Sequence, residues 1–172
     1  MPKVIKISLN TKDLKKAIQE VEKYKQDLQR KINIFRKRLA DELADEAQSG
    51  FNSAIMDDLT KGGSRTPDVN VSVTDKGNIS VVIADGEDAI WCEFGAGVYH
   101  NGSVGSSPHP LGVELGYTIG GYGKGYGKGK AWGYYEDGEL KITRGTPASM
   151  PMYNAMKSVM AKAITIAREV WK

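Results

Sequence analysis

The chain has 172 residues, of which 40% are hydrophobic and 26% charged, a composition typical of one soluble globular domain. Its net charge of +3, from 24 basic and 21 acidic residues, is too small by itself to indicate nucleic-acid binding. The single cysteine, Cys92, excludes an intrachain disulfide and a cysteine-rich zinc site. The first residues lack the apolar core of a signal peptide, and no run approaches the roughly 18 apolar residues of a membrane span. We therefore expect a protein of reducing, cytosol-like conditions with no membrane contact.

The N-terminal third predicts a short strand and then one long helix. Residues 4–9 alternate apolar and polar side chains, which is the period of a half-buried strand. Asn10 or Thr11 can cap the helix, with Asp13 in the first turn, where the helix dipole favours negative charge. The next apolar residues recur at a mean step of about 3.7, which favours a straight helix over a heptad coiled coil. They are Leu14, Ile18, Val21, Tyr24, Leu28, Ile32, Phe35, Leu39, Leu43, Ala47 and Phe51.

A helix over residues 11–49 would be about 58 Å long, more than the width of a small domain. It either bends or breaks, or another subunit buries part of its apolar stripe, and we favour subunit contact. Gly50 indicates its end. Arg36, Lys37 and Arg38 could contact nucleic acid, although charges on a long helix more often form a solvated face.

The segment after the helix predicts a loop and then a β-hairpin. Residues 57–67 are polar and glycine-rich and are expected to form the loop. In the segment 69–83, Val69, Val71 and Val73 alternate with polar residues, residues 75–78 supply a turn and residues 79–83 return as a second strand, which predicts the hairpin. A short aromatic turn at 88–97 then joins the two halves of the fold, and its Trp91 and Phe94 are expected to fill the core.

The C-terminal half predicts a long insertion, a second hairpin and a closing helix. Residues 98–130 are rich in glycine and are expected to form a mobile loop in the isolated protein. Residues 131–143 predict the hairpin, and residues 151–171 the helix, with Pro151 suited to its first turn. The expected fold class is α+β: a long N-terminal helix and a C-terminal helix packed on a small antiparallel β-sheet, all within one domain, 1–172.

The sequence shows no catalytic, cofactor-binding or metal-binding constellation. Its two histidines, His100 and His109, lack the spacing of metal ligands. Cys92 and His109 would make a thiol dyad, but a cysteine with apolar neighbours is more often a small buried hydrophobe. The glycine repeats lack the Gly-Lys-Ser/Thr ending of a phosphate-binding loop. We therefore expect no enzyme activity, no cofactor and no metal.

The basic, tyrosine-spaced part of the insertion leaves two interpretations open. Its tyrosines could stack on bases while its lysines meet phosphates, as in single-stranded nucleic-acid binding. Alternatively, the loop orders only within an assembly, which we favour. In either case, the residues concerned are Tyr122, Lys124, Tyr126, Lys128 and Lys130.

Two blocks of the sequence resemble the tail-component, or tail-completion, family of long-tailed bacteriophages. The first, Trp-Cys-Glu-Phe-Gly-Ala-Gly at 91–97, is similar to the Glu-Phe-Gly-Thr-Gly that follows a strand pair in that family. The second, at 144–155, is similar to the family's Ala-x-Pro-Phe-Met block before the last helix, with Met152 in place of phenylalanine. The aromatic hairpin at 132–139 resembles members from phages of Gram-positive bacteria. The motif residues are Trp91, Glu93, Phe94, Gly95, Gly97, Gly145, Pro147, Ala148, Pro151 and Met152.

This resemblance implies a structural role at the junction between the capsid neck and the tail tube. It implies a ring, expected to be a hexamer that matches the six-fold tail, with each subunit joined to the next by two different patches. The implied partners are the chain itself, neck or head-completion proteins, tail-tube or tail-terminator proteins, and DNA in the channel through non-specific contact. The implied location is the virion, and the bacterial host cytoplasm during assembly. The alternative function is a basic nucleic-acid-binding module that uses the Gly/Tyr/Lys loop.

Overall fold

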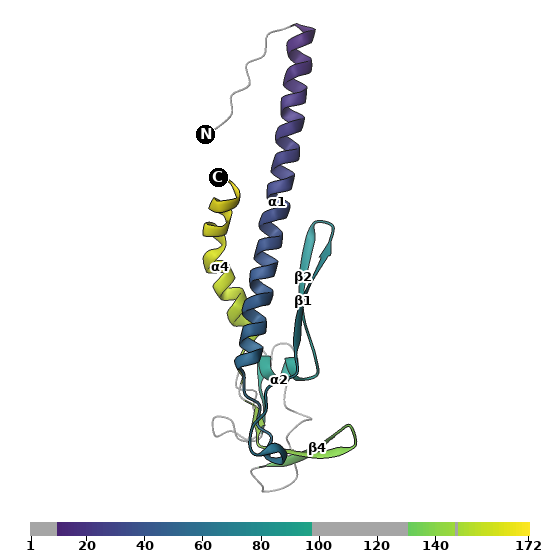
Figure 1. The fold of residues 1–172 in the computed structure, drawn as a ribbon, viewed down its shortest axis with the longest axis vertical. Helices are drawn as coiled ribbons and strands as arrows, with labels where there is room; N and C mark the ends of the chain where they lie inside the picture. Colours follow the sequence, from purple (N-terminus) through teal and green to yellow (C-terminus); the bar gives the residue numbers. More distant parts are fainter. Residues whose placement is uncertain (1–9, 98–130, 147) are drawn as a thin grey trace.

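The computed structural model describes residues 10–97, 131–146 and 148–172, which are arranged around one long helix, α1, Thr11–Ser53 (Figure 1). The side chain of Asn10, one of the two residues that the sequence offers as the cap, caps this helix by accepting the backbone N–H of Asp13 at 2.8 Å. The second long helix, α4, Pro151–Val170, runs back along the C-terminal half of α1 (Figure 1). The strand expected at residues 4–9 lies outside the described residues.

Helix α1 does not end at Gly50, as the sequence suggested, but continues to Ser53. Gly50 instead marks the place where α4 begins against α1. A Cβ atom at this position would lie 2.9 Å from the Cβ of Pro151, closer than two such carbons pack. Glycine at position 50 therefore allows α4 to approach α1 closely and does not end the helix. A sequence pattern does not distinguish these two uses of glycine.

Within residues 10–97, 131–146 and 148–172, the strands form three antiparallel pairs. Strand β1, Asn70–Lys76, pairs with β2, Ile79–Asp85, which confirms the first hairpin. Strand β4, Trp132–Glu136, pairs with β5, Glu139–Thr143, which confirms the second. Two short strands, β3 at Ala96–Gly97 and β6 at Gly145–Thr146, form the third pair. The fold is thus α+β, and the expected sheet is divided into separate two-stranded sheets. The loop expected at 57–67 contains a 3₁₀ turn, η1, Leu59–Lys61.

The aromatic stretch forms a helix, α2, Asp88–Phe94, and not the turn that the sequence suggested. Its fully buried side chain is Cys92, at 0% exposure, whereas Trp91 and Phe94 are only half-buried. The expectation that both rings fill the core is therefore wrong for Phe94 and only partly right for Trp91, which packs on the core from its edge. The core cluster consists of Phe51, Ala54, Met56, Val69, Ala89 and Cys92.

Two elements cover the C-terminal part of α1, and both end near the same level. The ring of Trp171, at the end of α4, meets Phe35 edge-on at a centroid distance of 5.4 Å. The turn of the β1–β2 hairpin reaches Arg36, which donates a hydrogen bond to the carbonyl oxygen of Gly77. We call residues 35–53 of α1 the body and residues 11–34 the arm, which projects beyond both elements (Figure 1).

Candidate functional site

Glu93, on helix α2, caps the N-terminus of helix α4. Its carboxylate accepts the backbone N–H groups of Met152 and Tyr153, each at 2.9 Å. The N–H groups in the first turn of a helix have no intrahelical partners, and the positive end of the helix dipole lies there. A carboxylate at this place accepts hydrogen bonds from the N–H groups, and its negative charge interacts favourably with the dipole. Pro151, the first residue of α4, has no N–H to satisfy. These bonds compensate for the burial of Glu93, which is 9% exposed.

Backbone hydrogen bonds join the same two segments next to this cap. The carbonyl oxygen of Cys92 accepts the N–H of Ser149 at 2.9 Å and that of Met150 at 3.3 Å. Met150 has φ +53°, a left-handed conformation that is uncommon for a residue with a Cβ. We call the contact between residues 91–97 and residues 145–153 the junction.

Two glycines allow the short pairing of β3 with β6 that completes the junction. Ala96 lies opposite Thr146, and Gly97 lies opposite Gly145. Gly95, which ends α2, has φ +78°, and Gly145 has φ +110°. Both values lie in the region that residues with a Cβ rarely adopt. Backbone geometry therefore explains the glycines at these two motif positions.

The junction unites the two sequence blocks that resemble the tail-completion family. Of the other motif residues, Met152 packs against the core cluster and Ala148 is half-buried. Pro147 lies outside the described residues. The first block contributes a side chain, Glu93, and backbone groups, and the second block meets them with its backbone, although Glu93 and Met152 are 59 positions apart. Among the motif residues that the structure describes, Glu93 meets Met152 and Gly97 meets Gly145 in this one contact.

Cys92 has the surroundings of a structural thiol. It is 0% exposed, and burial, helped by the charge of Asp88, raises its pKa to about 12. The thiolate is the reactive form, and a thiol with such a pKa is almost entirely protonated near neutral pH. His109, the other member of the dyad that the sequence left open, lies outside the described residues. The position of Cys92 agrees with the interpretation of a small buried hydrophobe.

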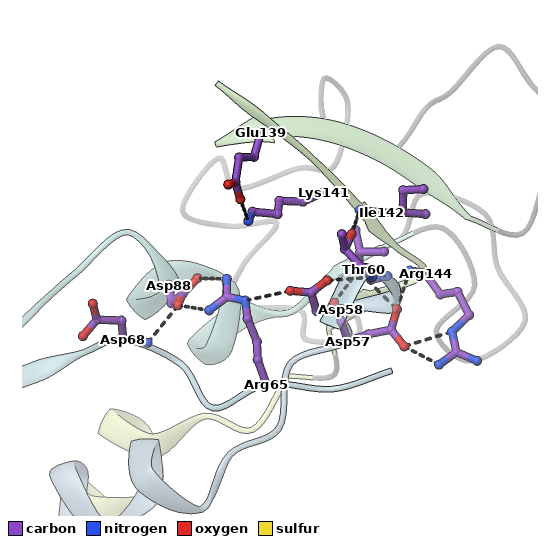
Figure 2. A network of polar contacts seen from close by, with 12 residues as sticks. Asp57, Asp58, Thr60, Arg65, Asp68, Asp88, Glu139, Lys141, Ile142 and Arg144 are labelled. Atoms are coloured by element: carbon purple, nitrogen blue, oxygen red, sulfur yellow. Dashed lines mark hydrogen bonds and ion pairs between the residues drawn. The ribbon is translucent and has the colours of Figure 1, made fainter. Parts of the chain in front are cut away.

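A second polar cluster ties α2 to the loop that follows α1 (Figure 2). The guanidinium of Arg65 donates two hydrogen bonds to the carboxylate of Asp88, and the backbone N–H of Asp68 donates to the same carboxylate at 2.8 Å. Arg65 also lies 4.0 Å from the carboxylate of Asp58. Asp88 is 6% exposed and Asp58 is 2% exposed. The two hydrogen bonds between Arg65 and Asp88 fix the orientation of the guanidinium relative to the carboxylate as well as the distance between them.

The same cluster anchors the β4–β5 hairpin (Figure 2). Arg144 donates hydrogen bonds to the carboxylate of Asp57 from both its guanidinium and its backbone N–H. The Thr143 hydroxyl donates to the Asp57 carbonyl oxygen, and the Ile142 N–H donates to the Thr60 hydroxyl, both at 2.8 Å. Burial of Asp57 opposes ionisation, but its hydrogen bonds with Arg144 outweigh this, and the pKa of Asp57 lies below its ordinary value.

Sequence reasoning did not identify this polar cluster. Asp57, Asp58 and Arg65 lie in a loop, and charges in loops are usually solvated. The available signal was the adjacent Asp57–Asp58 pair in a short segment that also contains an arginine. Their partners, Asp88 and Arg144, are distant in the sequence, so the pattern alone could not have paired them.

The basic residues considered for nucleic-acid contact fall into two groups. Arg36 and Lys37 form ion pairs with Asp75 on the β1–β2 hairpin, while Arg38 pairs with Glu169 on α4. These three side chains therefore link α1 to its neighbours. The second group, Tyr122, Lys124, Tyr126, Lys128 and Lys130, lies with the rest of the expected loop, 98–130, outside the described residues.

Within the described parts of the chain, no cluster of three or more His, Cys, Asp or Glu side chains is placed to hold a metal ion. No helix in those parts is both long and apolar enough to cross a membrane. The chain matches no family model, no curated protein and no solved structure. The family relationship therefore stays a prediction from the two sequence blocks.

Proposed function

We propose that this chain is a structural virion protein of the phage neck or tail junction, where it forms a ring that completes the tail and helps to join it to the head. The observation that carries the proposal is the junction. The two blocks that resemble the tail-completion family contact each other through the Glu93 cap, the Cys92 carbonyl oxygen and the β3–β6 pair. Blocks that resembled the family by chance would have no reason to build one structural unit.

The arm of α1 supports an assembly role. Its large apolar side chains, each between 36% and 65% exposed, follow one another along the helix, whereas the small Ala17 is 8% exposed. Contiguous exposed apolar surface on a soluble protein commonly marks an interaction site. A ring subunit needs such a surface, because each copy joins the next through two different patches. The proposed partners are further copies of the chain and the neck and tail proteins above and below the ring.

The proposal is tested by deleting the gene from the phage or prophage that carries it and examining the particles by electron microscopy. We expect filled heads and separate tails in the lysate, and a return to joined particles when the wild-type protein is supplied. Glu93→Ala, which removes the cap between the two blocks, should complement poorly. Lys16→Ala, on the exposed polar side of the arm, is the matched control and should complement fully.

Two results would overturn this function. The first is normal joining of heads and tails without the protein. The second is a purified protein that stays monomeric over a concentration series in light scattering and does not bind to purified tails. A discrete closed oligomer, or one that forms on added tails, supports the proposal.

A further inference from the structure

The spacing of apolar residues on the arm is typical of a helix that packs against another helix. Over the whole of α1 the mean step is about 3.7, but the arm taken alone follows a seven-residue repeat. Between Leu14 and Ile32, Lys25 is the one polar residue at a core position of this repeat. A repeat of about 3.5 residues per turn keeps an apolar seam facing a second helix. The core positions of the repeat are filled by Leu14, Ile18, Val21, Leu28 and Ile32, all at least 36% exposed.

Helix α4 carries a second apolar face that no described element covers. Its inner face, which includes Ala155, Val159 and Ile166, is buried. An outer line of larger residues remains accessible, with Met160 at 68% exposure and Ile164 at 67%. The outer stripe of α4 is Met156, Met160, Ile164 and, after the helix end, Trp171. Methionine is common on surfaces that adapt to a partner, because its side chain is flexible and polarizable.

The arm and the outer stripe of α4 are matched in length but do not meet within one chain. The arm's stripe, residues 14–32, is about 27 Å long, and the outer stripe, residues 156–171, is about 22 Å long. Trp171 at the end of α4 contacts Phe35, so α4 stops where the arm begins. The straight arm extends away from that point (Figure 1). Its own α4 therefore cannot cover it, whereas the α4 of another copy can.

We infer that the arm of one copy packs on the outer stripe of α4 of a second copy. This inference rests on the proposed function, because it names the contact through which the copies of the ring would join. One such contact, about 27 Å by about 10 Å, covers about 270 Å², less than the about 800 Å² per partner of a standard complex. Each copy carries both faces, so an open chain of copies leaves one face uncovered at each end, whereas a closed ring covers both faces of every copy. The assembly is therefore cooperative and closes with rising concentration.

Disulfide cross-linking of two separately purified variants tests the contact. Val21→Cys and Ile164→Cys lie near the middle of the two stripes, so they approach each other whichever way the helices run. Cys92 is fully buried and does not compete. After mixing at high concentration under mild oxidation, we expect a disulfide-linked species that contains one chain of each variant. The same mixture with Met160→Ala added to the Ile164→Cys chain should give a lower yield.

Lys23→Cys is the matched control for the arm, because two residues along a helix turn the side chain to the opposite face. Mixed with Ile164→Cys, it should cross-link at least about tenfold less than Val21→Cys does. The inference is overturned if Val21→Cys alone links to itself as readily as in the mixture, which would mean arm-to-arm pairing. Equal linking by Lys23→Cys, or no link between chains, would also overturn it.

Failure of this inference can be distinguished from failure of the proposed function. If the cross-link is absent but the wild-type protein still forms a closed oligomer and joins heads to tails, the function stands and the ring closes through other surfaces. If the cross-link forms but head–tail joining does not depend on the protein, the contact stands and the function is wrong.

Discussion

The arm and the body belong to one uninterrupted helix, yet they are built from different apolar residues. The buried face of the body is mostly alanine, with Ala40, Ala44 and Ala47 between 0% and 9% exposed and Phe51 at its end. The arm instead presents Leu, Ile, Val and Tyr side chains to solvent. Small residues let a second helix approach closely, as Gly50 does against Pro151. The size of the apolar residues, more than their period, therefore marks which half is packed within the chain.

Within the described part of the chain, the ion pairs of the body join it to other elements, whereas those of the arm do not. Those of the body join different elements: Arg38 pairs with Glu169 on α4, and Lys162 on α4 pairs with Glu42 and Glu46. In the arm, the ion pairs that the structure describes stay within the helix, between Asp27 and two basic residues of the next turn. The charges of the body position its neighbours, whereas those of the arm stabilise only the helix itself.

The largest expected difference is in thiol reactivity, between Cys92 in the core cluster and a cysteine placed on the arm. At pH 8, Cys92 should react with a thiol reagent about 10³-fold more slowly than the exposed thiol of Val21→Cys, whose expected pKa is about 8.5. The reason is the burial that raises the pKa of Cys92 to about 12. Stopped-flow absorbance on the Val21→Cys protein should resolve one fast and one very slow thiol. Two fast thiols would mean that the core cluster around Cys92 opens readily.

The same pKa shift gives a pH dependence of stability. Because the pKa of Cys92 is raised in the folded state, the native protein holds this proton more tightly than the unfolded chain does. The contribution is complete below the unfolded pKa of about 8.5 and is lost as the pH rises toward 12. Cys92→Ala should remove this part of the alkaline loss in urea unfolding curves measured from pH 8 to pH 11. An unchanged pH profile in that variant would contradict the assignment.

Truncation of an apolar side chain should lower the free energy of unfolding much more in the body than in the arm. Phe51→Ala, which empties a 1% exposed site in the core cluster, should cost about 3–5 kcal/mol in urea unfolding. Ile18→Ala, at a 65% exposed arm position, should change the value by no more than about 0.5 kcal/mol when the protein is monomeric. Equal losses would show that the arm is packed within the monomer.

Removal of one partner from a buried ion pair should cost slightly less. Asp88→Ala leaves the guanidinium of Arg65 without the carboxylate that accepts two of its hydrogen bonds, and should cost about 3 kcal/mol. The matched exposed pair, Arg38 with Glu169, should cost no more than about 1 kcal/mol when Arg38→Ala removes it. Both values come from urea unfolding at low salt. A small loss for Asp88→Ala would mean that water reaches this cluster.

Elements with a long, regular apolar period were predictable from the sequence. The helix starting at Thr11, the helix starting at Pro151 and the two hairpins follow from their periods and turn residues. Helix α2 was not predictable, because seven residues are too few to show a helical period. Their aromatic side chains suggested a turn whose rings fill the core. The β3–β6 pair was not predictable either, since each strand has only two residues.

The junction was predictable only as two separate blocks. The resemblance selected Glu93, but nothing in its neighbours shows that its carboxylate caps a helix 59 positions away. That no described element covers the large apolar side chains of the arm is also a three-dimensional fact, because it depends on where α4 and the β1–β2 hairpin end. The sequence raised subunit contact as one explanation of the helix length, and that explanation stays a prediction.

The two N-terminal caps give the smallest expected difference between the packed region and the arm. Glu93→Ala removes a buried carboxylate that accepts two N–H groups at the start of α4, and should cost about 2 kcal/mol in urea unfolding. Glu93→Gln keeps one acceptor oxygen and should cost less. Asn10→Ala removes the exposed cap of the arm and should cost at most about 1 kcal/mol, visible mainly as fraying in circular dichroism. If Glu93→Ala proves as mild as Asn10→Ala, the cap does not hold the two blocks together, and the junction loses its main side-chain contact.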